Sequence, residues 1–329
     1  MKAIRIKEYG GPEQLVIAEE ATPQPGAGQL LIKVHATALN RADILQRKGH
    51  YPPPPGASEI PGLEMAGEVV ATGPGCKEFS KGDRVFALLA GGGYAQYVCI
   101  PEVHALPIPE EMSYSDAAAI AEVFLTAWQA LHWLGEIQAD EHVLIHAGAS
   151  GVGTAAIQLA REAGCKIAVT ASTAEKLAFC KQLGAQQSIN YTSEDFATVV
   201  KDWTKGKGAN CVIDFIGAPY TRQHLDCLAK DARWIVLAFM GGAKTEDFHF
   251  GKILQKRIQL KGSTLRARSD AYKASLASDF RRKALPLFEA GKLKPVVYKT
   301  YPWEQVADAH RLMEHNENIG KIVLHVSHD

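Results

Sequence analysis

The sequence lacks the features that define several common classes of protein. Its 36 basic and 36 acidic residues leave no net charge, which argues against nucleic acid or an anionic membrane as a partner. No apolar run approaches the roughly 18 residues that a membrane-spanning helix needs. The first residues, MKAIRIKEYGG, are too polar for a signal peptide. We therefore expect a cytosolic globular protein, and 329 residues suffice for two domains.

Clustered metal ligands are also missing from the sequence. Structural zinc needs four ligands that converge within about 2.3 Å of one ion, but no two cysteines are spaced as Cys-x-x-Cys. No predicted helix carries a His-x-x-x-His pair. A disulfide framework would be unusual in a cytosolic chain of this length. We interpret the six cysteines as free thiols: Cys76, Cys99, Cys165, Cys180, Cys211 and Cys227.

The first 120 residues contain short alternating runs that are separated by turns rich in glycine and proline. Strands are predicted at residues 30–39, 67–73, 83–89 and 94–100. The run YPPPPG, residues 51–56, cannot form a helix or a central strand because proline has no backbone N–H. Many short strands with such turns are typical of a barrel-like, mostly antiparallel β domain.

The pattern changes at Ser113, which is predicted to cap a helix over residues 113–135 with Asp116 three residues further on. Strands and helices then alternate from residue 141 to residue 265, which indicates βαβ units on a parallel sheet. A final strand at residues 320–326 is expected to return to the first domain. The predicted fold class is therefore α/β, with a β domain followed by a doubly wound parallel domain.

The most informative motif is a glycine-rich loop between a predicted strand and a predicted helix. It has the form G-x-G-x-x-G with serine in the second glycine position, and its residues are Gly148, Ala149, Ser150, Gly151, Val152 and Gly153. Glycines in this context allow a tight turn and bring helix N–H groups to a pyrophosphate. A glycine-rich turn without a ligand is the alternative.

The residues after the second predicted strand of this domain indicate which dinucleotide binds. NAD sites usually carry Asp or Glu there, to hold the ribose hydroxyls. This sequence instead places Ser172 and Lys176 there, and Tyr191 ends the next strand. A hydroxyl, an ammonium and a phenol suit a 2′-phosphate, so we expect NADPH. The alternative is that Lys176 is only a solvated helix residue.

The stretch IPGLEMAG, residues 60–67, places Glu64 among small and apolar residues with no charged neighbour in sequence. A buried carboxylate must be hydrogen-bonded or paired. We therefore expect a structural role for Glu64, and a catalytic role is the alternative.

The sequence resembles the medium-chain dehydrogenase/reductase superfamily over essentially its whole length. The matching motifs include GLEMAGEVVATG, GGGYAQY, AGASGVGTAAIQLA and NIGKIVL. The resemblance implies a GroES-like catalytic domain, residues 1–122 with 267–329, and a Rossmann domain, residues 123–266. Zinc-dependent members have Gly-His-Glu where this chain has Leu63 before Glu64, and no cysteine stands in the matching segment 38–44. The resemblance therefore implies no metal.

Within the superfamily the chain is similar to the zinc-independent quinone oxidoreductases, especially the branch typified by the tumour-suppressor-inducible enzyme. The segments that carry this are ALNRADILQRKGHYPPPPGAS and EHNENIGKIVL. The resemblance implies that Asn40, Tyr51 and Thr126 surround the nicotinamide and the quinone. Further cofactor contacts are expected, from strand ends and the last loop, at Ile216, Phe239, Met240, Gly241, Leu265, Arg266 and Asn318.

The predicted activity is transfer of reducing equivalents from NADPH to a quinone. A quinone is a strong hydride acceptor and needs positioning more than a Lewis acid. Tyr51 is expected to donate a hydrogen bond to the developing phenolate, or else to be a packing aromatic. Reduction of α,β-unsaturated ketones or thioesters, and cofactor binding without turnover, are the alternative functions. The apolar run 257–265 at a probable sheet edge predicts a homodimer.

Overall fold

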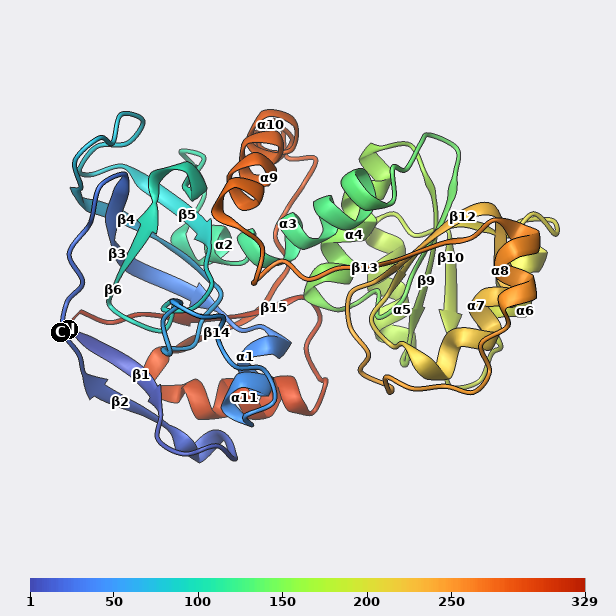
Figure 1. Ribbon diagram of the computed structural model, residues 1–329, viewed down its shortest axis with the longest axis horizontal. Helices are drawn as coiled ribbons and strands as arrows, with labels where there is room; N and C mark the ends of the chain where they lie inside the picture. The colour runs from blue at the N-terminus through green and yellow to red at the C-terminus, as the bar shows by residue number, and fades with distance from the viewer. Residues whose placement is uncertain (329) are drawn as a thin grey trace. The chain divides into compact units, whose positions relative to one another are not determined.

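The computed structural model describes residues 1–328. The chain divides into two compact units (Figure 1). The first unit comprises Met1–Leu125 together with Leu265–Asp329, and the second comprises Thr126–Thr264. The C-terminal segment thus belongs to the first unit, as the sequence predicts for its last strand.

The first unit is built on a mostly antiparallel sheet of seven strands. Its order is β14-β15-β3-β4-β5-β7, with β6 paired to β3, and β1 and β2 form a separate ribbon. The last strand, β15, pairs with β3, so the end of the chain completes this sheet. The strands are β1 (Lys2–Ile6), β2 (Leu15–Glu19), β3 (Gln29–Ala38), β4 (Glu64–Thr72), β5 (Arg84–Leu88), β6 (Tyr97–Pro101), β7 (Leu106–Pro107), β14 (Val297–Pro302) and β15 (Lys321–His325).

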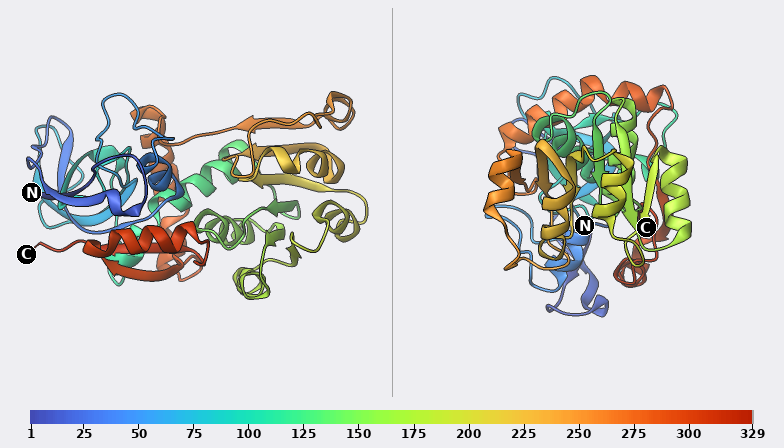
Figure 2. Two further views of the ribbon diagram at one scale, coloured as in Figure 1. Left: turned by 90° about the horizontal axis from the view of Figure 1, so that it is seen from below. Right: turned by 90° about the vertical axis from the view of Figure 1, so that its right-hand side faces the viewer.

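Helices cover the strands of the first unit. Helix α11 packs on β14 and β15, as the left view of Figure 2 shows, and its Val306, Ala309 and Met313 join one apolar core with residues of β3, β4 and β15. The helices are α1 (Arg41–Arg47), α2 (Tyr114–Ala118), α3 (Ala121–Trp128), α9 (Asp270–Lys283), α10 (Leu285–Glu289) and α11 (Val306–Glu314).

The second unit contains a six-stranded sheet in which all paired strands run parallel, in the order β10-β9-β8-β11-β12-β13. This is the strand order of a Rossmann fold, and the direction of winding reverses between β8 and β11. Ligands of such sheets bind beyond the carboxyl ends of the strands at this reversal point. The strands are β8 (His142–Ile145), β9 (Lys166–Ala171), β10 (Gln187–Asn190), β11 (Ala209–Asp214), β12 (Leu228–Val236) and β13 (Gln259–Gly262).

Two groups of helices pack on this sheet. Helix α4 packs with α5 and α6 packs with α7, and α8 contacts β12. Figure 1 shows α6, α7 and α8 together beside the sheet. Phe196, Val200 and Leu225 from α6 and α7 share one core with residues of β8, β9 and β11. The helices are α4 (Gly151–Glu162), α5 (Ala174–Leu183), α6 (Phe196–Trp203), α7 (Thr221–Cys227) and α8 (Phe250–Lys256).

The predicted helix over residues 113–135 is not continuous. Ser113 caps α2 through Asp116 N–H, as predicted, but the chain turns at Ala119–Ile120 and a new helix, α3, begins at Ala121. A buried carboxylate accepts the N–H of Glu122 in the first turn of α3 and so stabilises the second helix start. A π-helical segment, Gln129–Leu134, completes the run.

None of the helices among residues 1–328 is long and apolar enough to cross a membrane.

Candidate functional site

The loop before β4 in the first unit is fixed by a glycine. Gly62 has φ +98°, and a Cβ there would lie 2.6 Å from the backbone nitrogen of Tyr94. A side chain at this position would therefore meet both a disfavoured backbone conformation and a backbone neighbour. Leu63 is buried beside it, and Glu64 begins β4 with no exposed surface.

Glu64 is paired on both carboxylate oxygens, which confirms the expectation that it is buried and hydrogen-bonded. Its Oε1 accepts from Lys321 Nζ at 2.7 Å and from Asn40 Nδ2 at 2.9 Å. Its Oε2 accepts from the Glu122 N–H at 2.8 Å. Lys321 is only 3% exposed, so both charges of the pair are out of water. A buried pair of this kind persists because each charge has partners.

Asn40 belongs to the same hydrogen-bond network as Glu64 and Lys321. Besides its bond to Glu64, its Nδ2 donates to the Ala38 carbonyl at 3.3 Å, and its Oδ1 accepts from Lys321 at 2.6 Å. Both ends of the side-chain amide are therefore held by the protein itself. The arrangement fixes the orientation of Asn40 and leaves its amide with few means of binding a ligand directly.

A second buried carboxylate, Asp43, lies in the first turn of α1. It accepts from the backbone N–H groups of Asn40 at 2.8 Å and Gly62 at 3.1 Å, and from Tyr94 Oη at 3.3 Å. Burial raises the pKa of Asp43 to about 6, although the backbone donors act in the opposite direction. Asp43 thus joins the Asn40 segment to the loop that carries Glu64.

Tyr51 differs from Asn40 in having an available polar group. Its side chain is partly exposed, and within residues 1–328 its hydroxyl meets no hydrogen-bond partner. Burial raises the pKa of this phenol, and the charge of Glu122 raises it further, whereas the charge of Arg266 lowers it. Tyr51 is therefore a candidate donor to a bound molecule.

In the second unit, the predicted phosphate loop lies between β8 and α4, at the reversal point of the sheet. A Cβ on Gly148 would approach Val169 Cβ at 2.8 Å, and one on Gly153 would lie 2.3 Å from the Ala147 carbonyl oxygen. Only glycine permits this close approach of strand and helix. Ser150 caps α4 by accepting the Gly153 N–H at 3.0 Å, while the other early amides of the helix have no intrahelical acceptor.

The three residues predicted to recognise the 2′-phosphate follow neighbouring strands β9 and β10. Ser172 comes directly after β9, Lys176 lies in the first turn of α5, and Tyr191 follows β10 with 46% of its surface exposed. The Tyr191 N–H donates to the Ala171 carbonyl, which ties the two strand ends together. Burial lowers the pKa of Lys176. Two hydroxyls and an ammonium are donors of the kind that suits a phosphate, so these residues would be chemically suited to a 2′-phosphate.

The other predicted contacts of the second unit lie beyond β11 and β12. The Gly241 N–H donates to Ile216 O, so these two strand-end loops are joined. Phe239 and Met240 are 65% and 56% exposed at the same place. Thr126 is buried in α3.

The remaining predicted contacts lie in the first unit. Leu265 and Arg266 are buried, and they follow β13, which ends at Gly262. Asn318 Nδ2 donates to Gly320 O at 2.7 Å just before β15. The roles of all these residues remain predictions.

Lys321 and Asp43 are the important residues that sequence reasoning missed. Lys321 stands in the motif NIGKIVL, but nothing in its local sequence indicates that its ammonium is buried against a carboxylate at the other end of the chain. Asp43 could have been found as a carboxylate three residues after a possible N-cap, Asn40.

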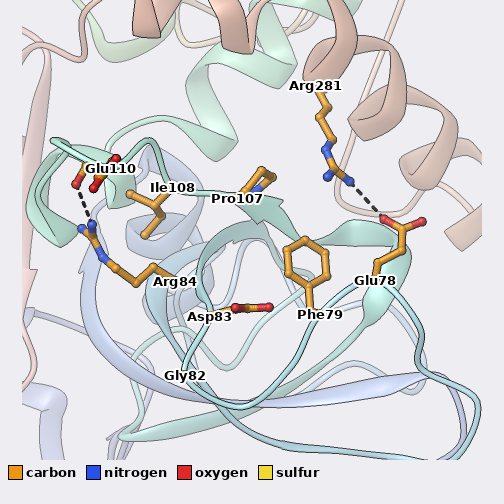
Figure 3. A pocket seen from close by; sticks show the side chains of 9 residues that line it. All are labelled: Glu78, Phe79, Gly82, Asp83, Arg84, Pro107, Ile108, Glu110 and Arg281. Carbon is orange, nitrogen blue, oxygen red and sulfur yellow. Dashed lines mark hydrogen bonds and ion pairs between the residues drawn. The ribbon is translucent and has the colours of Figure 1, made fainter.

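A surface pocket of about 440 Å³ lies elsewhere in the first unit (Figure 3). The pocket adjoins Arg84 at one end of β5, where the strand register places Arg84 opposite Glu68 of β4. Glu64 lies opposite Leu88, at the other end of β5, so the pocket is remote from Glu64 along the strands. Its arginines already have partners: Arg281 meets Glu78 at 3.0 Å, and Arg84 donates to the Glu110 carbonyl at 2.9 Å. We assign it no part in the candidate site.

Metal ligands do not gather around Glu64. Within the described part of the chain, no three His, Cys, Asp or Glu side chains lie close enough together to hold an ion.

Comparisons with known proteins match both units. Residues 26–110 match the alcohol dehydrogenase GroES-like domain, and residues 151–279 match the zinc-binding dehydrogenase family. The human quinone oxidoreductase is 34% identical over 330 residues, which cover 98% of this chain and 97% of that protein. The chain belongs to the medium-chain dehydrogenase/reductase superfamily, with quinone oxidoreductases among its relatives.

Solved structures agree in fold and differ in cofactor and reaction. A mycobacterial protein complexed with NADPH has a TM-score of 0.88 at 29% identity, covering 99% of this chain and 100% of that one. An NAD-dependent alcohol dehydrogenase has a TM-score of 0.88 at 32% identity, with the same coverage. The CurK enoyl reductase has a TM-score of 0.88 at 28% identity and 99% coverage of both chains. The chain is thus a nicotinamide-dependent oxidoreductase with a GroES-like and a Rossmann-like unit.

Proposed function

We propose that the protein reduces quinones with NADPH and needs no metal for this reaction. The observation that carries the proposal is Tyr51, a partly exposed residue whose hydroxyl has no hydrogen-bond partner among residues 1–328. Similarity to the human quinone oxidoreductase over almost the full length of both chains supports the choice of acceptor.

The second unit would hold the dinucleotide. The first amides of α4 and the Ser150 hydroxyl are suited to the pyrophosphate. The 2′-phosphate would suit Ser172, Lys176 and Tyr191. Residues 172–191 contain a single carboxylate that could bind a ribose hydroxyl instead, the exposed Glu175. The bound nicotinamide would supply a hydride.

The first unit would act on the acceptor. When a quinone accepts a hydride, one of its oxygens gains negative charge, and a hydrogen bond from Tyr51 Oη stabilises that charge. The oxygen then takes its proton from water, so Tyr51 keeps its own. Asn40, fixed by Glu64 and Lys321, would line the site without itself exchanging protons.

Reduction of α,β-unsaturated ketones or thioesters is the second candidate, because the CurK enoyl reductase shares the fold over 99% of both chains. The same Tyr51 donor would serve an enolate oxygen. Cofactor binding without turnover is the third possibility, and it predicts no oxidation of NADPH by any acceptor.

The test is a steady-state screen of quinones, enones and enoyl thioesters, each with NADPH and with NADH. The proposal predicts the highest kcat/KM for a quinone with NADPH, and a large loss of kcat in Tyr51→Phe. Faster turnover of an enone or thioester would replace the first candidate by the second. Tight NADPH binding without any turnover would support the third.

We also propose a homodimer in which the sheet continues across β13. This strand lies at the edge of the parallel sheet, and edge strands offer unpaired backbone groups to another chain. Leu260 on β13 is 45% exposed, and Phe250 and Leu254 on the preceding helix α8 are 76% and 80% exposed. A cytosolic location is part of the same proposal, on the basis of composition.

A further inference from the structure

Arg266 is predicted from the sequence as a cofactor contact, but its guanidinium group lies against the Tyr51 segment. Its Nε donates to Ala90 O at 2.8 Å, its Nη2 to Gln46 Oε1 at 2.7 Å and its Nη1 to Tyr51 O at 3.3 Å. The guanidinium carbon lies 5.1 Å from the centroid of the Tyr51 ring. The residue is 5% exposed, so these contacts account for a cation that is almost fully buried.

These contacts hold the proline-rich loop at both ends. Arg266 binds the Tyr51 carbonyl at the start of the loop, and Gln46, which accepts from Arg266, donates its own Nε2 to Glu59 O at 2.9 Å. Gln46 is only 3% exposed. The four prolines supply no N–H, and the loop's own backbone bond runs from the Ala57 N–H to Pro54 O at 3.0 Å, away from Tyr51. Arg266 and Gln46 therefore help to fix the position of Tyr51.

The charge of Arg266 also acts on the phenol. A cation within about 6 Å of a ring centroid is attracted to the ring face. The positive charge of Arg266 also favours the ionised phenol, which makes the O–H a stronger hydrogen-bond donor. The opposing charge is Glu122 on α3, which disfavours the ionised phenol. Around Arg266 itself lie Asp43 on α1 and Lys273 on α9. Lys273, which is 9% exposed, adds a second positive charge near Arg266.

We propose that Arg266 is a positioning residue for Tyr51: it orients the ring and strengthens the O–H as a hydrogen-bond donor to the acceptor oxygen. The proposal rests on the proposed function, since it assigns a residue that assists Tyr51 in stabilising the acceptor oxygen. The electron balance is that of hydride transfer: the acceptor oxygen gains the charge, Tyr51 stabilises it, and water supplies the proton.

The first experiment needs no cofactor and no acceptor. The tyrosinate absorbance is titrated with pH in the wild type and in Arg266→Gln, and each curve is compared with the same protein carrying Tyr51→Phe. The difference isolates Tyr51 from the other tyrosines. Loss of a unit charge about 5 Å from the ring is expected to raise the pKa of Tyr51 by roughly one. Arg268→Gln, a nearby arginine over the Tyr272 ring, is the matched control and should leave that pKa unchanged.

The second experiment is kinetic and uses a double-mutant cycle. Arg266→Gln should lower kcat for the quinone about tenfold and leave the Kd of NADPH, measured by calorimetry, unchanged. In the Tyr51→Phe background the same change should have little further effect, because Arg266 acts through Tyr51. If Arg266→Gln does not fold, Arg266→Lys replaces it: the charge remains, so the pKa of Tyr51 stays near its wild-type value, while the lost fork geometry still lowers kcat.

Three results would overturn the proposal: an unchanged pKa of Tyr51 in Arg266→Gln, an equal loss of kcat in both backgrounds, or a weaker Kd for NADPH. A weaker Kd for NADPH would instead indicate that Arg266 contacts the cofactor. A wild type that reduces no quinone would instead refute the proposed function, and the absorbance titration would still report whether Arg266 acts on Tyr51.

Discussion

Substitution of Lys321 by methionine is the most direct test of the buried network around Glu64. Lys321 and Glu64 are 3% and 0% exposed, and their charged atoms lie 2.7 Å apart. Methionine keeps much of the side-chain volume but leaves the carboxylate without its counter-ion. Removing one partner of a buried pair typically costs about 3–5 kcal/mol, because the remaining charge stays buried. For a unit of this size, that corresponds to a fall in Tm of about 6–20 °C.

The assay is urea unfolding followed by circular dichroism, together with a double-mutant cycle. Glu64→Gln removes the negative charge and keeps one acceptor oxygen, which can serve either the Asn40 amide or the Glu122 N–H. The double variant should therefore lose less free energy of unfolding than the sum of the losses of the two single variants. The difference, the coupling free energy, should be at least about 2 kcal/mol. Lys7→Met, at an exposed lysine, is the control and should change stability by less than about 0.5 kcal/mol.

The reasoning would be refuted by a loss below about 1 kcal/mol in Lys321→Met. Additive effects of the two single variants would refute it equally, because independent sites add. Either result would mean that water or another group compensates Glu64.

The remaining predictions concern the cofactor and the assembly. One charge-assisted contact to the 2′-phosphate is worth about 1.5–3 kcal/mol, or about 10- to 150-fold in affinity, so kcat/KM should favour NADPH over NADH by at least tenfold. Lys176→Ala should remove much of this preference by weakening NADPH, and Ser172→Asp should go further; equal losses with both cofactors would make Lys176 a solvated residue. Light scattering at micromolar concentration should show a dimer, and Leu260→Lys with Leu254→Lys should shift it toward monomer. A wild-type monomer would contradict the proposed edge pairing.

Much of the fold could be predicted from local sequence because its elements follow simple periodicities. The glycine that ends α4, Gly164, has φ +76°, as its position after the apolar pattern indicates. The break between α2 and α3 could not be predicted, since it depends on a carboxylate, Glu64, that is distant in sequence and accepts the N–H of Glu122. Local pattern specifies helices, and tertiary hydrogen bonds decide where one long pattern becomes two.

The candidate site shows a similar division. The family resemblance implies that Asn40 and Tyr51 alike line the pocket, but only the structure distinguishes an amide held at both ends by the protein from a hydroxyl without a protein partner. The position of Arg266 after the strand predicts a cofactor contact, which stays a prediction; the structure adds that β13 ends at Gly262 and that the guanidinium binds the Tyr51 segment. Strand order predicts which loops meet at a sheet edge, and it does not predict where the chain goes after the strand.

The same network leads to a final prediction, on metal binding. Restoring the histidine of the zinc-dependent relatives by Leu63→His should not create a zinc site. Zinc needs three or four ligands with free lone pairs, and both oxygens of the neighbouring Glu64 already accept from Lys321, Asn40 and the Glu122 N–H. The added imidazole would also enter a position that is only 4% exposed, at a cost in stability because it buries a polar ring without a partner. Elemental analysis should therefore find sub-stoichiometric zinc in the wild type and in Leu63→His, and a chelator should leave wild-type activity intact. One tightly bound zinc ion per chain in the variant would show that the carboxylate can leave Lys321 for a metal, and that the buried pair is weaker than its geometry implies.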